Sequence, residues 1–278
     1  MDYIESACCF DTSAYTGTPD TAPCPKSVDM PTFIARLDAL YSKGQEAKAG
    51  QLLDEEAENA RKLGDWRSEL SLLSEICGHC RRSAEKEKAM DAIGRIYEII
   101  REHRMGSTVS AATVLLNAAT TLKCFGEAER SVPVFEHVSR VYAVHLDPYD
   151  YRFAGLYNNM ALSYADVGEH EQAEKLFKAA MKVIEQCKNP QNELAVSLCN
   201  LAELYYKQDA EDGRVNECME KAWEYLNDPT LPRDGYHAFT ISKCAPSFDY
   251  FGFFLYAKEL KERAAVIYEL SLKSKGAL

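Results

Sequence analysis

The tetrapeptide Cys77-Gly78-His79-Cys80 places two thiols at a spacing that can support thiol–disulfide chemistry. That chemistry needs a lowered thiol pKa, which the N-terminus of a helix provides. The tetrapeptide instead follows residues 70–76, LSLLSEI, whose apolar spacing predicts a helix that continues through both cysteines. Because burial within a helix raises a thiol pKa, we expect Cys77 and Cys80 to be small core residues, with a thiol oxidoreductase as the weaker alternative.

No other motif in the sequence indicates catalysis, a metal or a cofactor. The six histidines show no pairing at helical ligand spacing, and there is no second Cys-x-x-Cys pair to complete a zinc site. The motifs GxxxxGK[ST], GxGxxG and GxSxG are absent. Carboxylates are abundant, but on an acidic helical protein they usually form a solvated surface. We therefore expect a protein that is not an enzyme.

The composition indicates an acidic globular protein. The 278 residues are 46% hydrophobic and 27% charged, and 43 acidic against 32 basic residues give a net charge of −11. Binding to nucleic acid or to an anionic membrane needs clustered positive charge, and no such cluster occurs. There is no secretory signal and no run of about 18 apolar residues. The ten scattered cysteines then predict reduced thiols in the cytoplasm.

The chain divides into a leader and a helical domain. Residues 1–30 are rich in Thr, Ser, Pro and Gly without periodicity, which predicts a flexible leader. Across residues 31–278, apolar residues recur at three and four positions, which predicts an all-α domain of roughly a dozen helices with short connections. Breaks between helices are predicted at residues 44, 62–65, 104–107, 125–127, 147–150, 167–169, 188–191, 209–213 and 227–235.

One apolar pattern repeats along this domain. Around Ala161, large residues stand at Tyr157, Met160 and Tyr164, and the pattern recurs at steps of 41 or 42 residues. The small residue of each repeat forms a column, which reads Cys77, Ala119, Ala161, Ala202 and, after a longer step, Gly252. Residues 32–63 form a weaker sixth unit. Since one helical hairpin cannot bury its own apolar face, the repeats predict stacked hairpins that approach most closely at the small residues.

The repeated pattern resembles the tetratricopeptide repeat, whose consensus is an aromatic, two residues, Leu-Gly, two residues and Tyr, followed by Ala, three residues and Phe. Residues 154–187 match best, and a looser resemblance covers residues 66–275. The period exceeds the family's 34 residues, and Glu185 stands where the closing proline is expected. The resemblance implies a right-handed α-solenoid of about six antiparallel hairpins that binds a protein or peptide in its concave groove.

A polar column stands two residues before the small column. It reads Glu75, Asn117, Asn159, Asn200 and Tyr250. Asn is a mediocre helix former, so its recurrence needs a reason. Either the side chains bind the neighbouring hairpin and fix its packing, or they pair with the backbone of an extended peptide, as the resemblance implies. We take peptide binding as the working hypothesis and keep packing as the alternative.

Charged residues on the same first helices complete the predicted peptide-binding set. They are Arg82, Lys123, Asp166 and Lys207. Their mixed signs do not indicate a clamp for a C-terminal carboxylate. Each one taken singly also fits a solvated surface charge.

The run FDYFGFFLYAKEL, residues 248–260, contains six aromatics in its first nine positions. The surplus of Phe253, Phe254 and Tyr256 predicts a homodimer or partner surface, and packing under residues 228–247 is the alternative. Taken together, the sequence predicts a cytoplasmic, non-enzymatic scaffold or adaptor that binds a protein or an extended peptide segment. A peptide-sensing regulator of the same fold is the main alternative.

Overall fold

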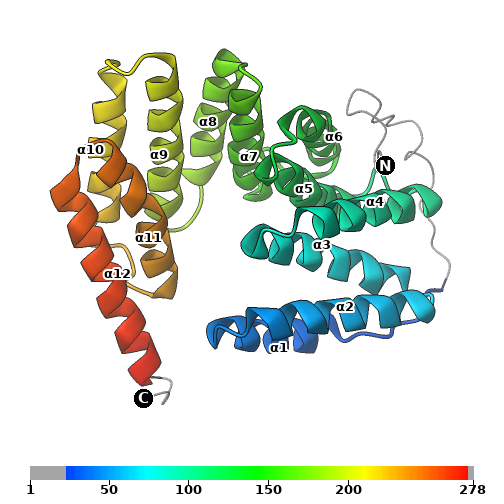
Figure 1. Ribbon diagram of the computed structural model, residues 1–278. Helices are drawn as coiled ribbons and strands as arrows, with labels where there is room; N and C mark the ends of the chain where they lie inside the picture. The colour runs from blue at the N-terminus through cyan, green and yellow to red at the C-terminus, as the bar shows by residue number, and fades with distance from the viewer. Residues whose placement is uncertain (1–22, 275–278) are drawn as a thin grey trace. The chain divides into compact units, whose positions relative to one another are not determined.

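The computed structural model describes residues 23–274, and the side chains of residues 23–270. All regular secondary structure within residues 23–274 is helical, in twelve helices (Figure 1). The predicted all-α fold of about six hairpins is therefore confirmed. The chain forms two compact units that divide between Leu146 and Asp147, so the predicted repeat domain of residues 31–278 is shared between them. We call them unit 1 and unit 2.

Unit 1 contains three helical hairpins. Its helices are α1 (Met30–Ser42), α2 (Glu46–Lys62), α3 (Trp66–Ser83), α4 (Lys86–Glu102), α5 (Val109–Cys124) and α6 (Ala128–His145). The helix α3 packs against α2, α4 and α5, so the first helices of the second and third hairpins are neighbours.

Unit 2 also contains three hairpins. Its helices are α7 (Arg152–Asp166), α8 (His170–Ile184), α9 (Gln191–Gln208), α10 (Arg214–Leu226), α11 (Gly235–Tyr250) and α12 (Phe254–Ser274). The first helix of the middle hairpin, α9, packs against both α7 and α11. The first helices of unit 2 therefore form one continuous layer.

The small column marks the tightest packing in both units. Cys77, Ala119, Ala161 and Ala202 are all 0% exposed. In the first three of these hairpins, a residue with positive φ follows seven positions later and begins the turn into the second helix: Ala84, Gly126 and Gly168, with φ of 58°, 82° and 85°. The repeat register predicted for these four hairpins is confirmed.

The register predicted for the last hairpin is wrong by seven residues. Gly252 lies in the turn between α11 and α12 with φ of 86°, and the buried small residue is Ala245, which is 1% exposed. Lys243 therefore occupies the polar column in place of Tyr250. Seven residues are close to two helical turns, so this shift leaves the apolar periodicity nearly unchanged and hides the error.

Part of the predicted flexible leader is held against unit 1. Ser27 donates from its backbone N and its Oγ to Asp65 Oδ2, at 2.6 and 2.8 Å, and Val28 is buried. Asp65 also caps α3 by accepting from Ser68 N at 3.1 Å. These contacts fix residues 23–29, and the rest of the predicted leader, residues 1–22, lies outside the described residues.

Candidate functional site

The Cys-x-x-Cys pair lies in the middle of α3 and has no accessible thiol. Cys77 and Cys80 are both 0% exposed, and burial raises the pKa of their thiols to about 12 and about 11. A thiol with such a pKa is protonated at neutral pH and is a poor nucleophile. The prediction of two small core cysteines is confirmed, and their burial does not support the oxidoreductase alternative.

His79, between the two cysteines, joins the first two hairpins. It is 4% exposed, and its Nδ1 lies 3.0 Å from Tyr41 Oη on α1. Its ring lies so close to α2 that a Cβ at Gly50 would be 2.6 Å from Nε2. Burial lowers the pKa of His79, although Glu85, at 3.6 Å from Nε2, acts in the opposite direction. The sequence motif thus has a packing role that its spacing did not reveal.

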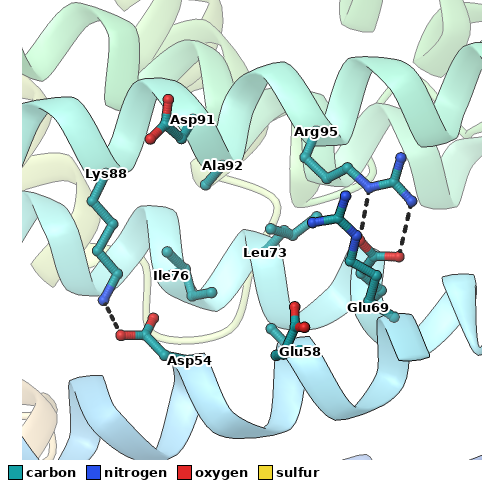
Figure 2. A pocket seen from close by; sticks show the side chains of 11 residues that line it. Asp54, Glu58, Glu69, Leu73, Ile76, Lys88, Asp91, Ala92 and Arg95 are labelled. Carbon is teal, nitrogen blue, oxygen red and sulfur yellow. Dashed lines mark hydrogen bonds and ion pairs between the residues drawn. The ribbon is translucent and has the colours of Figure 1, made fainter. Parts of the chain in front are cut away.

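A pocket of about 240 Å³ lies between α2 and α4 in unit 1 (Figure 2). Ala57, Leu73, Ile76 and Ala92 form its apolar part, and an ion pair closes each end. Arg95 donates from Nε and Nη2 to the two oxygens of the buried Glu69, at 2.7 and 3.2 Å. Lys88 binds Asp54 at 2.6 Å. These charges satisfy one another, which indicates that the pairs hold α2, α3 and α4 together.

No candidate metal centre occurs in the part of the chain that the structure describes. Within it, no group of three or more His, Cys, Asp or Glu side chains is arranged to hold a metal ion. None of its helices has the length and hydrophobicity needed to cross a membrane.

Asn117, the asparagine of the polar column in unit 1, binds the neighbouring hairpin. Its Nδ2 donates to Ser74 Oγ on α3 at 2.9 Å. Its backbone carbonyl accepts from Arg81 Nη1 at 3.3 Å, and Arg81 also donates to Thr121 Oγ1 at 2.6 Å. These bonds connect α3 with α5, as the packing alternative requires.

The two column asparagines of unit 2 differ from Asn117. Asn159 donates from Nδ2 to Gly155 O in its own helix, at 2.9 Å. Asn200 is half-buried on α9 and makes no side-chain hydrogen bond to another described residue. Among the three column asparagines, its carboxamide is therefore the most available for hydrogen bonding.

The predicted charged residues fall into different surroundings. In unit 1, the guanidinium of Arg82 lies 3.9 Å from the ring centroid of Tyr41, and Lys123 is half-buried near the end of α5. In unit 2, Lys207 pairs with Glu203 one turn earlier at 2.9 Å, and Asp166 is exposed at the end of α7. Their role in peptide binding stays a prediction.

Exposed aromatics on α11 border the polar column in unit 2. Tyr236, Phe239 and Tyr250 are 53%, 51% and 67% exposed. With Lys243 they lie at positions 236, 239, 243 and 250, which is one stripe along a helix. This stripe was not predicted from the sequence because the predicted register of the last hairpin was shifted, and the small residue Ala245 is the signal that could have placed it. We call Asn159, Asn200, Tyr236, Phe239, Lys243 and Tyr250 the unit 2 face.

Two contacts connect the α11 stripe with α9. Tyr236 Oη donates to Glu193 Oε1 at 2.8 Å, and burial together with this carboxylate raises the pKa of Tyr236 to about 12. The ring of Tyr206 packs edge-on against Tyr250, with centroids 5.4 Å apart. Two of the three aromatics of the unit 2 face, Tyr236 and Tyr250, are thus supported by contacts from α9.

A buried histidine also joins α9 to α11. His237 is 0% exposed, with Nδ1 at 2.9 Å from Asn192 Oδ1 and Nε2 at 2.7 Å from Arg233 Nη1. A guanidinium only donates, so Nε2 must accept, and the ring proton must lie on Nδ1 and bind Asn192. Burial, and then the charges of Arg233 and Arg263, lower the pKa of His237 to about 4.

The aromatics of residues 248–260 are divided between packing and solvent. Tyr256 stacks on Trp223 with centroids 4.0 Å apart, and Phe253 lies 6.1 Å from Phe248. Phe253 and Tyr256 thus take part in packing within unit 2, but against residues outside 228–247, so packing under that segment stays a prediction. Phe254 is 66% exposed, so the predicted partner or dimer surface stays a prediction for this residue.

Comparison with known proteins agrees with the resemblance seen in the sequence. Residues 152–212 match the family model described as tetratricopeptide repeat. No curated protein shows significant similarity to the chain. The match includes the α7–α8 hairpin, where the sequence resemblance was strongest, and the predicted resemblance is confirmed.

Several solved structures share the fold at low sequence identity. Nearly identical TPR-like repeats of a putative kinesin light chain from Podosopora anserina have 16% identity, a TM-score of 0.52, and cover 73% of this chain and 97% of theirs. A single-residue variant of those repeats has 16% identity, a TM-score of 0.53, and covers 75% and 97%. BtubC (BKLC) from P. vanneervenii has 14% identity, a TM-score of 0.51, and covers 81% and 92%.

Proposed function

We propose that this chain, which resembles the tetratricopeptide repeat in sequence and fold, is a non-enzymatic scaffold or adaptor that binds an extended peptide segment of a partner protein. Repeat proteins of stacked helical hairpins commonly use extended surfaces for binding. The buried thiols of Cys77 and Cys80 support the absence of redox chemistry. All eight cysteines among the described residues are free, which supports a cytoplasmic location.

The observation that carries the proposal is the available carboxamide of Asn200. An amide side chain offers both donors and an acceptor, so it can pair with the N–H and C=O groups of a peptide whatever the peptide sequence. The unbonded Oδ1 of Asn159 and the ammonium of Lys243 lie at the equivalent positions of the neighbouring helices. Together they provide a row of hydrogen-bonding groups across α7, α9 and α11.

The aromatics of the unit 2 face supply the apolar contact. Tyr236, Phe239 and Tyr250 are large and at least half exposed, and such residues contribute strongly to protein interfaces. Among the other predicted contacts, Arg82, Asn117 and Lys123 lie in unit 1, and Asp166 and Lys207 in unit 2. Asn117 already donates one N–H of Nδ2 to Ser74, so its second N–H and its Oδ1 are left for a peptide.

The test begins with a partner captured by the full chain and identified by mass spectrometry. Its binding segment is synthesised, and its affinity for the wild type, Asn200→Ala and Asn216→Ala is measured by calorimetry. Asn216 is exposed on α10, a second helix, and serves as the matched control. We expect Asn200→Ala to weaken binding about tenfold, which corresponds to one or two lost hydrogen bonds, and the control to change nothing. Equal affinity of all three proteins would show the proposal to be wrong.

A further inference from the structure

A second surface, on the first hairpin of unit 1, forms a groove of about 460 Å³ between α1 and α2. Its apolar part consists of Ala39, Leu40 and Leu52. Three cations, Arg36, Lys43 and Lys48, line it as well. We call this surface the α1–α2 groove.

The first hairpin aligns with the others through Gly44, whose φ of 65° corresponds to the positive φ of Ala84, Gly126 and Gly168. In this alignment, the apolar part of the groove corresponds to positions that are buried elsewhere in the chain. Leu40 and Leu52 are only half-buried. The equivalents of Leu52 in the other five hairpins are all buried, and so are four of the five equivalents of Leu40, the exception being Tyr164. The equivalents of Leu52 are Ala92, Val134, Leu176, Cys218 and Leu260, and the buried equivalents of Leu40 are Cys80, Leu122, Tyr205 and Phe248. The α1–α2 groove therefore has the character of a packing face that no described residue covers.

The charges of the groove select the kind of partner. Arg36, Lys43 and Lys48 form no ion pair with another described residue, and Glu55 is the only carboxylate among the eight lining residues. Glu55 accepts from Gln51 at 2.8 Å, and this single carboxylate leaves the three cations in excess. This local positive charge stands out on a chain with a net charge of −11.

We propose that the α1–α2 groove binds an acidic amphipathic helix of a partner protein, independently of the unit 2 face. In the other hairpins, these positions lie in contact between helices, so a helix has the right shape to cover them. The apolar stripe of the bound helix lies on Leu40 and Leu52, and its Asp and Glu side chains face Arg36, Lys43 and Lys48. This is binding of an amphipathic helix in a groove, in which the apolar residues anchor the helix and the charges select it.

The test uses a fluorescent peptide about five helical turns long, with Leu at helical spacing and Glu at the flanking positions. Its binding to the full chain is followed by fluorescence anisotropy. We expect Lys43→Glu/Lys48→Glu to weaken binding at least tenfold, and the affinity to fall between about 50 and about 200 mM salt because the ion pairs are screened. The control Lys175→Glu/Lys188→Glu changes the net charge equally at two exposed lysines of unit 2, and should change the affinity less than twofold.

Three results would overturn the proposal: no binding, equal loss in the two double variants, or equal binding of a peptide in which Lys replaces Glu. Leu52→Ser tests the apolar contact, and unchanged affinity in that variant also counts against the proposal. Circular dichroism checks that each variant is folded.

The source of the bound segment is tested by carbodiimide cross-linking of the full chain, mixed from isotopically light and heavy copies. Cross-links from Lys43 or Lys48 to the added peptide support the proposal. Cross-links to carboxylates of residues 1–22 in the same copy, or to a second copy, that persist when the peptide is in excess would assign the groove to this chain itself. Either of these two results would overturn the assignment to a partner protein.

Discussion

His79 in unit 1 and His237 in unit 2 have the same structural role in different electrostatic surroundings. Each is buried, and each connects neighbouring hairpins through a hydrogen bond at Nδ1, to Tyr41 and to Asn192. The other ring nitrogen faces a carboxylate, Glu85, in the first case and a guanidinium, Arg233, in the second. A proton added to His79 finds a partner, whereas one added to His237 meets a positive charge.

The comparison teaches that the pH response of a buried histidine depends on the group at its second nitrogen as well as on burial. Desolvation lowers both pKa values. In unit 1, Glu85 opposes this effect, whereas Lys88 and Arg82, each acting less strongly than Glu85, add to it. In unit 2 the charges of Arg233 and Arg263 add to it. We therefore expect acid to weaken unit 2 before unit 1.

The largest expected effect is the acid sensitivity of unit 2. Unfolded His237 takes up a proton below about pH 6.5, and folded His237 only below about pH 4, so stability falls as the pH falls through this window. This shift in the pKa of His237 corresponds to a loss of about 3 kcal/mol in the free energy of unfolding. Trp66 lies in unit 1 and Trp223 in unit 2, so Trp66→Phe leaves a fluorescence reporter for urea unfolding of unit 2.

The control for this prediction is His237→Gln in the same Trp66→Phe background. Glutamine cannot be protonated, so the loss of stability between about pH 6.5 and about pH 4 should shrink by most of the roughly 3 kcal/mol. An unchanged loss in this variant would assign the acid sensitivity to other groups and break the comparison.

The hydrogen bonds at Nδ1 of His79 and of His237 should differ about twofold in their contribution to the free energy of unfolding. Asn192→Leu leaves the buried N–H of His237 without a partner, and we expect a loss of about 2 kcal/mol. Tyr41 is only half-buried, so water can replace its hydroxyl, and Tyr41→Phe should cost about 1 kcal/mol. Urea unfolding followed through the tryptophan of each unit measures both losses, and equal losses would contradict the ranking.

Gly50→Ala should destabilise unit 1 by about 1 to 2 kcal/mol. The new methyl meets His79 Nε2 at 2.6 Å, and the cost of overpacking exceeds the gain in helix propensity. A double-mutant cycle with His79→Ala identifies the cause, because the smaller side chain should remove the penalty. A penalty that persists in the His79→Ala background would place its origin elsewhere.

The smallest expected effect has the opposite sign. Gly155 in unit 2 also lies within a helix, but a Cβ there would meet no atom within 4 Å. Gly155→Ala should therefore stabilise unit 2 by about 0.5 to 1 kcal/mol through its helix propensity alone. Thermal unfolding measures the gain, and a loss comparable to that of Gly50→Ala would mean that contact with His79 does not distinguish the two glycines.

The sequence predicted the helical fold more accurately than it predicted the repeat register of the last hairpin. Each of the nine predicted breaks coincides with a connection between helices to within one residue, but two further connections, at Ala84–Glu85 and at residues 251–253, were missed. At Ala84 a residue other than glycine adopts positive φ, so the usual turn signal is absent. At residues 251–253 the run of aromatics continued the apolar pattern through the turn. The predicted right-handed sense of the stack stays a prediction.

The candidate site was less predictable because it depends on contacts between distant helices. The column pattern located Asn117, Asn159 and Asn200, but it could not show that one of them binds Ser74 and another its own helix. The stripe on α11 was hidden by the seven-residue shift. The contacts of His237 join α11 to residues outside any repeated column, so the repeat pattern could not predict them.

The contact between His79 and Gly50 also limits how this sequence can change over time. An alanine at position 50 is harmful while the imidazole is present, whereas a smaller residue at position 79 leaves room for it. The order of substitutions therefore matters: a smaller side chain is needed at position 79 before alanine is tolerated at position 50. Although 29 positions separate the two residues in the chain, substitutions at them are expected to be correlated among related sequences.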